Sequence, residues 1–315
     1  MKIAFDARLD ATERADWWRA LTDALPDDDW LDPAIEGTQS ARWRAADIAV
    51  VANPLPGRLA HCGQLRLIQS LWAGVDRLLG DSTLPAAVPI ARMVDPAMNR
   101  AMAETATWAV LSVHRRAFDY AAQQRQTQWR ALPQKRADEV SVLVLGLGQM
   151  GRTTASQLAA LGYRVSGWSA RPQQVAGIAT SAGWVQLPAA LGAADVVVNL
   201  LPLTDDTRGL FDRARLAQMR AGASLVNLAR GAHVVEMDLL AALNAGRLEH
   251  AVLDVFDTEP LPATHVFWFH PRVTLWPHAA AQTDLRSAAA VVAANVEAVR
   301  RGDAPAHLVD RARGY

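Results

Sequence analysis

The chain has 315 residues, half of them hydrophobic, and its 32 basic residues balance its 32 acidic residues. This length suits two domains, and the composition excludes a disordered protein, while the neutral charge gives no long-range attraction to nucleic acid or to an anionic membrane. Cys62 is the single cysteine, which excludes an internal disulfide and a cysteine-based zinc cluster and predicts a buried apolar thiol.

The first third of the chain alternates short apolar strands with helices. Strands are expected at residues 2–6, 47–52 and 65–71, and a helix at residues 15–24. This alternation is typical of α/β layers on a parallel sheet. Tryptophans 17, 18, 30 and 43 are expected to pack this part, and the acidic run 27–29 is interpreted as a solvated loop rather than a metal-binding cluster.

A long helical pattern follows at residues 100–123. Its apolar stripe consists of Met102, Ala106, Ala109, Val110 and Val113. A polar stretch with Pro133 covers residues 123–139. Because a new strand begins soon afterwards, we place a domain boundary near residue 100, with a first domain at 1–102 and a second at 103–282.

Residues 142–151 carry the most informative motif. An apolar strand runs into Gly146-x-Gly148-x-x-Gly151, and a helical segment follows at residues 152–161. This is the pattern of a dinucleotide-binding βαβ unit, in which the glycines allow a tight turn, close approach of a pyrophosphate and close helix–strand packing. The helix N-terminus would offer its N–H groups to the phosphates. Glycine-rich turns also arise for packing alone, so the residues downstream decide between the two interpretations.

The βα alternation continues to the end of the chain. Further strands are expected at residues 163–168, 195–200, 224–228, 251–255 and 273–276, and helices at 212–219 and 236–245, the latter closed by Gly246. A last helix at residues 285–301 lies beyond the final strand. It is expected to pack back on the first domain, which would then comprise residues 1–102 and 283–315.

Three ionisable residues follow expected strands of the second domain. They are Arg230, Glu259 and His278. Each alone in a loop is most often structural, but in a parallel sheet all three would lie at the edge where ligands bind. A guanidinium can hold a carboxylate, and an imidazole beside a carboxylate can donate a proton. Together they favour reduction of a 2-oxo acid.

The expected strand 163–168 indicates which dinucleotide would bind. An NAD enzyme usually has Asp or Glu at the end of this strand, whereas this chain has Ser169-Ala-Arg171 and no carboxylate nearby. A hydroxyl and a guanidinium suit a 2′-phosphate. We therefore expect NADPH, with NADH as the weaker alternative and a solvated role for Arg171 as the competing interpretation. Arg152 is a second, weaker candidate for a phosphate contact.

Three stretches give the chain a recognisable resemblance. Residues 227–231 (NLARG), 253–262 (LDVFDTEPLP) and 276–280 (WPHAA) resemble the signature of the D-isomer-specific 2-hydroxyacid dehydrogenases. Within that family, residues 71–76, 230–236, 239–243 and 270–273 are most similar to the glyoxylate/hydroxypyruvate reductase A type. The resemblance covers nearly the whole chain.

The resemblance implies two Rossmann-like domains, a discontinuous flavodoxin-like domain for the substrate and an NAD(P)-binding domain at residues 103–282, with the active site in the cleft. It implies that Arg230 binds the substrate carboxylate and carbonyl, that His278 is the acid–base, and that Glu259 orients His278 and raises its pKa. Asp254 would accept from the nicotinamide carboxamide. The substrate loop would be Trp72, Ala73, Gly74 and Val75, with Trp72 either reshaping the pocket or only packing. The implied cofactor contacts are Gly146, Gly148, Gln149, Met150, Gly151, Trp168, Ser169, Arg171, Leu201, Pro202, Leu228, Ala229, Arg230, Asp254 and His278.

The expected activity is NADPH-dependent reduction of glyoxylate and hydroxypyruvate to D-2-hydroxy acids. The alternatives are the same chemistry on a bulkier 2-oxo acid, and a nicotinamide-sensing binding protein like the co-repressor branch of the family. A homodimer is expected by resemblance, through residues 100–139. No signal peptide, membrane-spanning run, metal site or nucleic-acid patch is evident, so the cytoplasm is the expected location. His233, near Arg230 in the sequence, is a minor candidate for a residue that lines the mouth of the substrate pocket.

Overall fold

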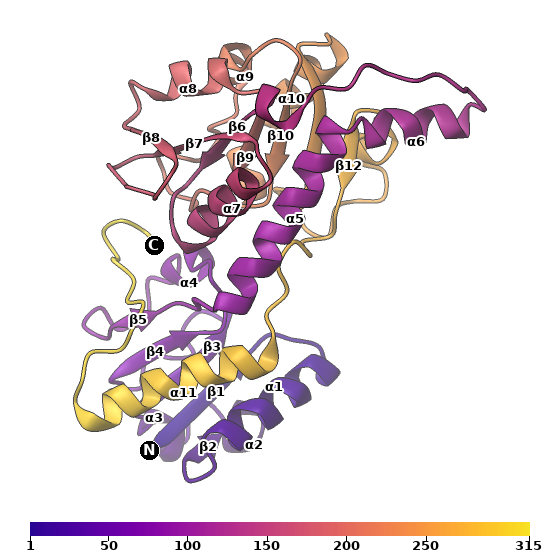
Figure 1. Ribbon diagram of the computed structural model, residues 1–315. Helices are drawn as coiled ribbons and strands as arrows, with labels where there is room; N and C mark the ends of the chain where they lie inside the picture. The colour runs from indigo at the N-terminus through magenta and orange to yellow at the C-terminus, as the bar shows by residue number, and fades with distance from the viewer. The chain divides into compact units, whose positions relative to one another are not determined.

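The computed structural model describes all 315 residues, which separate into two compact units. Unit 1 comprises Met1–Ala97 and Thr283–Tyr315, and unit 2 comprises Met98–Gln282. Each is a parallel sheet flanked by helices (Figure 1). The first boundary between the two units falls after Ala97, inside helix α5 (Pro96–His114) and a few residues before the boundary expected at residue 102. None of the helices combines the length and apolar character needed to cross a bilayer.

Unit 1 is built on five parallel strands. Their order is β2 (Asp29–Leu31), β1 (Lys2–Ala7), β3 (Ile48–Ala52), β4 (Leu67–Ser70) and β5 (Ile90–Ala91). Its helices are α1 (Ala11–Ala24), α2 (Pro33–Glu36), α3 (Ala41–Arg44), α4 (Asp76–Leu79) and α11 (Leu285–Arg301). The long helices α1 and α11 pack side by side (Figure 1).

Two of the four tryptophans expected to pack unit 1 lie in its core, and Trp18 and Trp30 are half-buried. Trp17 and Trp43 are buried, and Cys62 lies beside Trp43 with its thiol donating to the Trp43 carbonyl oxygen at 3.5 Å. Burial raises the pKa of Cys62 to about 11, so it stays an unreactive thiol. Helix α11 has the predicted bounds because Asp284 caps its N-terminus and Gly302, at φ 82°, ends it.

Unit 2 is built on seven parallel strands. Their order is β12 (Val273–Leu275), β11 (Leu248–Leu253), β10 (Ala223–Asn227), β9 (Val196–Asn199), β6 (Ser141–Leu145), β7 (Arg164–Ser169) and β8 (Ala179–Ala182). The chain runs outward from β6 to β8 and then returns to β9 on the other side of β6. The carboxyl ends of β6 and β9 therefore form the topological switch point, where ligands of open α/β sheets bind.

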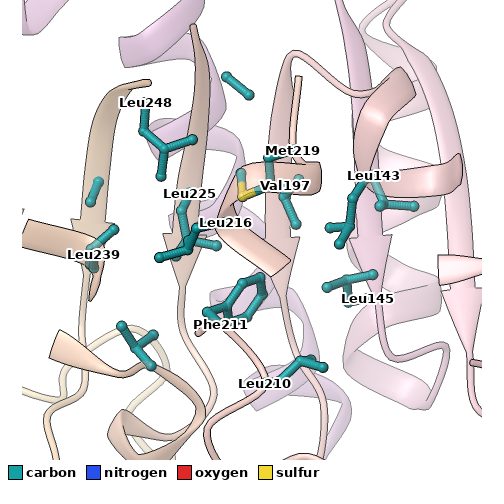
Figure 2. Packing of buried hydrophobic residues seen from close by; sticks show 14 of the residues in the cluster. Leu143, Leu145, Val197, Leu210, Phe211, Leu216, Met219, Leu225, Leu239 and Leu248 are labelled. Carbon is teal, nitrogen blue, oxygen red and sulfur yellow. The ribbon is translucent and has the colours of Figure 1, made fainter. Parts of the chain in front are cut away.

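Helices cover both faces of this sheet. They are α5 (Pro96–His114), α6 (Ala117–Arg125), α7 (Gln149–Ala160), α8 (Leu187–Ala193), α9 (Arg213–Gln218) and α10 (Glu236–Asn244), with 3₁₀ turns at Ala137–Glu139, Gly231–His233 and Val266–Phe269. One core joins Leu143 and Leu225 to residues of α8, α9 and α10 (Figure 2). The alternate strand residues, such as Val144 and Val226, pack on α5 and α7. The two cores confirm strands buried on both faces.

Two predictions, one for a helix of unit 2 and one for a loop of unit 1, were wrong. The single helix at residues 100–123 is broken, because Arg116 takes a left-handed conformation with φ 60° and α6 begins after it. The acidic run at residues 27–29 is not simply solvated. The Asp28 carboxylate is almost fully buried, accepts from the amino group of Met1 at 2.5 Å and pairs with Arg300 at 2.6 Å. Burial alone would raise the pKa of Asp28, but the two cations together outweigh it and lower that pKa.

Candidate active site

The glycine turn joins β6 to α7 at the switch point of unit 2. Gly146 has φ 93°, and a Cβ there would lie 2.7 Å from the carbonyl oxygen of Leu200, which follows β9. A Cβ on Gly151 would lie 1.7 Å from the carbonyl oxygen of Gly146, so only glycine fits. Gly148, in contrast, has no atom within 4 Å of its would-be Cβ. The turn is thus closed by backbone on two sides and open at Gly148, as a pyrophosphate cradle requires.

The turn after β7 is the expected 2′-phosphate position. Ser169 is mostly buried, and its hydroxyl donates to the Arg171 carbonyl oxygen at 2.6 Å. Arg171 is exposed. Trp168, named above as a cofactor contact, is fully buried with its indole N–H donating to Gly183, so only its backbone faces this turn. Arg152 is engaged with the carbonyl oxygens of Leu147 and Gln174 rather than directed at a ligand.

A buried polar network lies under the loops that follow β9 and β10. The Asn199 side-chain amide donates to Asn227 Oδ1 and to His233 Nδ1, each at 2.9 Å. Asn227 Nδ2 donates to the Arg230 carbonyl oxygen at 2.9 Å, and His233 Nε2 donates to the Pro202 carbonyl oxygen at 3.2 Å. His233 is therefore a fully buried, neutral brace, not a residue of a pocket mouth. The network fixes the backbone of Arg230, whose Nη1 donates to the Ala229 carbonyl oxygen at 2.7 Å.

The loop that carries His278 is held by Asp254. The His278 N–H donates to the Asp254 carbonyl oxygen at 2.8 Å. The Asp254 carboxylate accepts from the N–H groups of Ala279 at 2.7 Å and Ala280 at 3.1 Å. These contacts hold His278 at φ 54°, a left-handed conformation that costs about 1–2 kcal/mol for a residue with a Cβ. Burial raises the pKa of Asp254, and the two backbone donors oppose that rise.

His278 and Glu259 form a hydrogen-bonded pair. Nδ1 of His278 lies 2.8 Å from Oε2 of Glu259, and Oε1 of Glu259 accepts from the Phe256 N–H at 2.9 Å. The hydrogen bond from Glu259 raises the pKa of His278, against the opposing effects of burial and of the positive charge on Arg230. Nδ1 is thus the donor to the carboxylate, and Nε2 is the ring atom left to exchange a proton with a substrate.

Gly231 explains why Arg230 and Glu259 lie on neighbouring loops. A Cβ at Gly231 would lie 1.9 Å from the carbonyl carbon of Phe256, so the two loops touch through their backbones. No individual role in the site was predicted for Gly231, Asn199 or Asn227. Asn227 and Gly231 lie inside the NLARG motif, which was used only for Arg230. Asn199 ends β9 as a polar residue after three valines, a signal that a pattern search could have found.

The expected substrate loop lies in unit 1 after β4. Ser70 Oγ accepts from the Trp72 N–H at 3.0 Å, and the Trp72 carbonyl oxygen accepts from the Met93 N–H at 3.0 Å. The Trp72 ring packs edge-on against Trp17, with centroids 6.4 Å apart. This contact favours the packing role for Trp72. Ala73 and Gly74 are half-buried, and Val75 is buried at the start of α4.

A family model and a known protein are both similar to this chain over most of its length or over its second unit. The family model "D-isomer specific 2-hydroxyacid dehydrogenase, NAD binding domain" matches residues 107–280. A glyoxylate/hydroxypyruvate reductase A of Serratia proteamaculans is 41% identical over 305 residues, which cover 95% of this chain and 96% of that protein.

Solved structures agree along the full length. A D-isomer-specific 2-hydroxyacid dehydrogenase of Xanthobacter autotrophicus Py2, in complex with NADPH and MES, has a TM-score of 0.94 and 36% identity, covering 100% of this chain and 99% of that one. An NADPH-dependent glyoxylate/hydroxypyruvate reductase of Sinorhizobium meliloti, in complex with NADP and sulfate, has a TM-score of 0.92 and 34% identity with the same coverage. The chain belongs to the D-isomer-specific 2-hydroxyacid dehydrogenase family.

Proposed function

We propose that the protein reduces small 2-oxo acids, glyoxylate and hydroxypyruvate, to D-2-hydroxy acids with NADPH. The observation that carries the proposal is the His278–Glu259 pair, 2.8 Å apart, on the sheet edge of unit 2 that also carries Arg230 and the glycine turn. The names of the Serratia and Sinorhizobium relatives support the substrate class and the cofactor.

Arg230, His278 and Glu259 each have a separate role in the proposed reaction. Arg230 binds the carboxylate of the substrate and polarises the adjacent carbonyl, since a guanidinium offers paired donors to a planar carboxylate. When bound, the nicotinamide cofactor supplies the hydride for the carbonyl carbon. His278 gives a proton from Nε2 to the carbonyl oxygen, so that the C=O π bond becomes a C–H and an O–H bond. Glu259 keeps the imidazole charged before the transfer and oriented throughout it.

The cofactor would lie along the switch point. Gly146, Gly148 and Gly151, with the first turn of α7, would hold the pyrophosphate, because this is where the structure leaves room beside unpaired N–H groups. Ser169 and Arg171 would hold the 2′-phosphate, since no carboxylate repels it there. Asp254 would meet the nicotinamide carboxamide in addition to its loop contacts. In unit 1, Gly74 and Val75 would offer backbone N–H groups to the substrate carboxylate.

The test is a panel of steady-state assays that follow NADPH or NADH consumption. Glyoxylate, hydroxypyruvate, pyruvate and phenylpyruvate are compared at equal concentrations. The proposal predicts fast turnover of glyoxylate and hydroxypyruvate with NADPH and slower turnover with NADH. Activity confined to phenylpyruvate would replace the substrate class. A protein that binds NADPH but turns over none of the four would be a cofactor sensor rather than a reductase.

We also propose a homodimer formed through α5 and the segment after α6. Trp129 in that segment is fully exposed, and Trp108 and Leu111 on α5 are each more than one-third exposed. Large apolar side chains of this kind mark protein interfaces when they gather on one surface. Light scattering after gel filtration should give the mass of two chains, and Trp129→Ser should shift the protein toward one chain.

A further inference from the structure

Arg152 ties two segments of unit 2 together. Its Nε donates to the carbonyl oxygen of Leu147 at 2.9 Å, within the glycine turn. Its Nη1 donates to the carbonyl oxygen of Gln174 at 2.7 Å, and its Nη2 donates to the side-chain oxygen of Gln173. One guanidinium therefore connects the turn that would hold the pyrophosphate with the loop that follows Ser169 and Arg171.

That loop has few other contacts. Residues 170–174 are exposed and belong to no helix or strand. The Ser169 hydroxyl, at the end of β7, donates to the Arg171 carbonyl oxygen at 2.6 Å, and Val175 at the other end of the loop packs on the core, so only the two ends of the loop are attached to unit 2 in this way. A segment with little buried surface and few hydrogen bonds opens easily. Between these two ends, the bonds from Arg152 to Gln173 and Gln174 hold the loop against the glycine turn and so restrict the position of Arg171.

We propose that Arg152 is a positioning residue that clamps the Ser169–Arg171 loop against the glycine turn and thereby builds the preference for NADPH over NADH. The inference rests on the proposed NADPH-dependent function. A loop that is already ordered loses less conformational freedom when the 2′-phosphate binds, so affinity rises without a direct contact from Arg152. Arginine suits this task because its planar fork bonds several acceptors at once, which the single ammonium of lysine does not do.

The test measures the dissociation constants of NADPH and NADH, by quenching of protein fluorescence, for the wild type, Arg152→Ala, Arg152→Lys and Arg171→Ala. Arg164→Ala is the matched control, because Arg164 also donates to a main-chain carbonyl oxygen, that of Glu139 at 3.0 Å, but at the opposite end of β7. We expect Arg152→Ala to weaken NADPH binding about tenfold, equivalent to about 1.4 kcal/mol. NADH binding should change by less than about threefold, and Arg152→Lys should not restore NADPH affinity.

Two further measurements separate a clamp from a charge contact. The first is the double variant of Arg152→Ala and Arg171→Ala, in which NADPH affinity should be close to that of Arg171→Ala alone, because a clamp acts through the residue it holds. The second is hydrogen exchange of residues 170–175 in the cofactor-free protein. Exchange should be faster in Arg152→Ala and unchanged in Arg171→Ala.

Equal losses for NADPH and NADH in Arg152→Ala, full rescue by Arg152→Lys, or additive losses in the double variant would each overturn the clamp. A wild type that binds NADPH no better than NADH would overturn the proposed cofactor preference itself. The two failures are therefore distinguishable, since the first requires a wild type that still prefers NADPH.

Discussion

Replacing Glu259 with Gln removes the charge beside His278 while nearly preserving the shape of the side chain. Nδ1 and Oε2 lie 2.8 Å apart, so the two charges are centred roughly 4 Å from each other. At that distance the attraction is about 1 kcal/mol in water and about 4 kcal/mol near a protein surface. The His278 side chain is 52% exposed, which favours the lower figure. A loss of about 1 kcal/mol of this attraction lowers the pKa of His278 towards its ordinary value.

The assay is the pH dependence of kcat/KM for reduction. The proposed proton donor is the imidazolium of His278, so the account predicts that the rate falls as pH rises through the pKa of His278. In Glu259→Gln this fall should begin at lower pH, because the pKa of His278 is no longer raised by the neighbouring carboxylate. Well below both pKa values His278 is protonated in either protein, and the rates should converge. Titration of the His278 ring by NMR gives the same pKa without turnover.

Glu236→Gln is the matched control. Glu236 pairs with His265 at 3.1 Å in the same unit, outside the site, so the same substitution there should leave the pH profile in place. A Glu259→Gln profile with an unchanged midpoint and a uniformly lower rate would refute the electrostatic role and leave Glu259 as an orienting residue only.

Three further predictions concern the groups that support the site. The Asp254 carboxylate accepts from two N–H groups with its two oxygens, whereas the amide of Asp254→Asn has only one oxygen to accept with. This variant should reduce kcat about tenfold, and an unaltered kcat would remove its role in holding the His278 loop. Asn199→Ala leaves buried partners unsatisfied and should lower the free energy of unfolding in urea by about 1–3 kcal/mol, whereas no loss would mean that the network contributes nothing. Burial lowers the pKa of His250 from 6.5 to about 4. The unfolded chain therefore binds the extra proton between these values, and the free energy of unfolding should fall by about 3 kcal/mol as pH drops through that window. His250→Gln should flatten this part of the stability curve, whereas His61→Gln, a substitution at an exposed histidine of unit 1, should not. An equal slope in all three proteins would contradict the assignment.

Features that depend on neighbouring residues in the chain could be predicted from the sequence. The strand, glycine turn and helix at residues 141–160 follow from local requirements: Gly146 and Gly151 face backbone atoms within the same βαβ unit or at the next strand end. The same holds for α11, whose capping residues Asp284 and Gly302 adjoin its ends. Arg230, Glu259 and His278 could be found because each follows a strand of one parallel sheet.

Features that depend on distant residues could not be predicted. The break at Arg116 has no glycine or proline signal and is stabilised by an ion pair with Glu249 and by the stacking of Phe118 on His250. The burial of Asp28 depends on Arg300, 272 residues away. Strands β2 and β5 have three and two residues, too few to show a period, and form only because a neighbouring strand is present.

The central claim is that His278 supplies the proton in an NADPH-dependent reduction. The most direct test is single-turnover oxidation of bound NADPH by hydroxypyruvate in the wild type and in His278→Ala, with NADPH affinity measured for both. The predicted result is a rate lower by ~10²–10⁴ in the variant, with NADPH affinity kept within about threefold. A variant that reduces hydroxypyruvate at nearly the wild-type rate would contradict the claim.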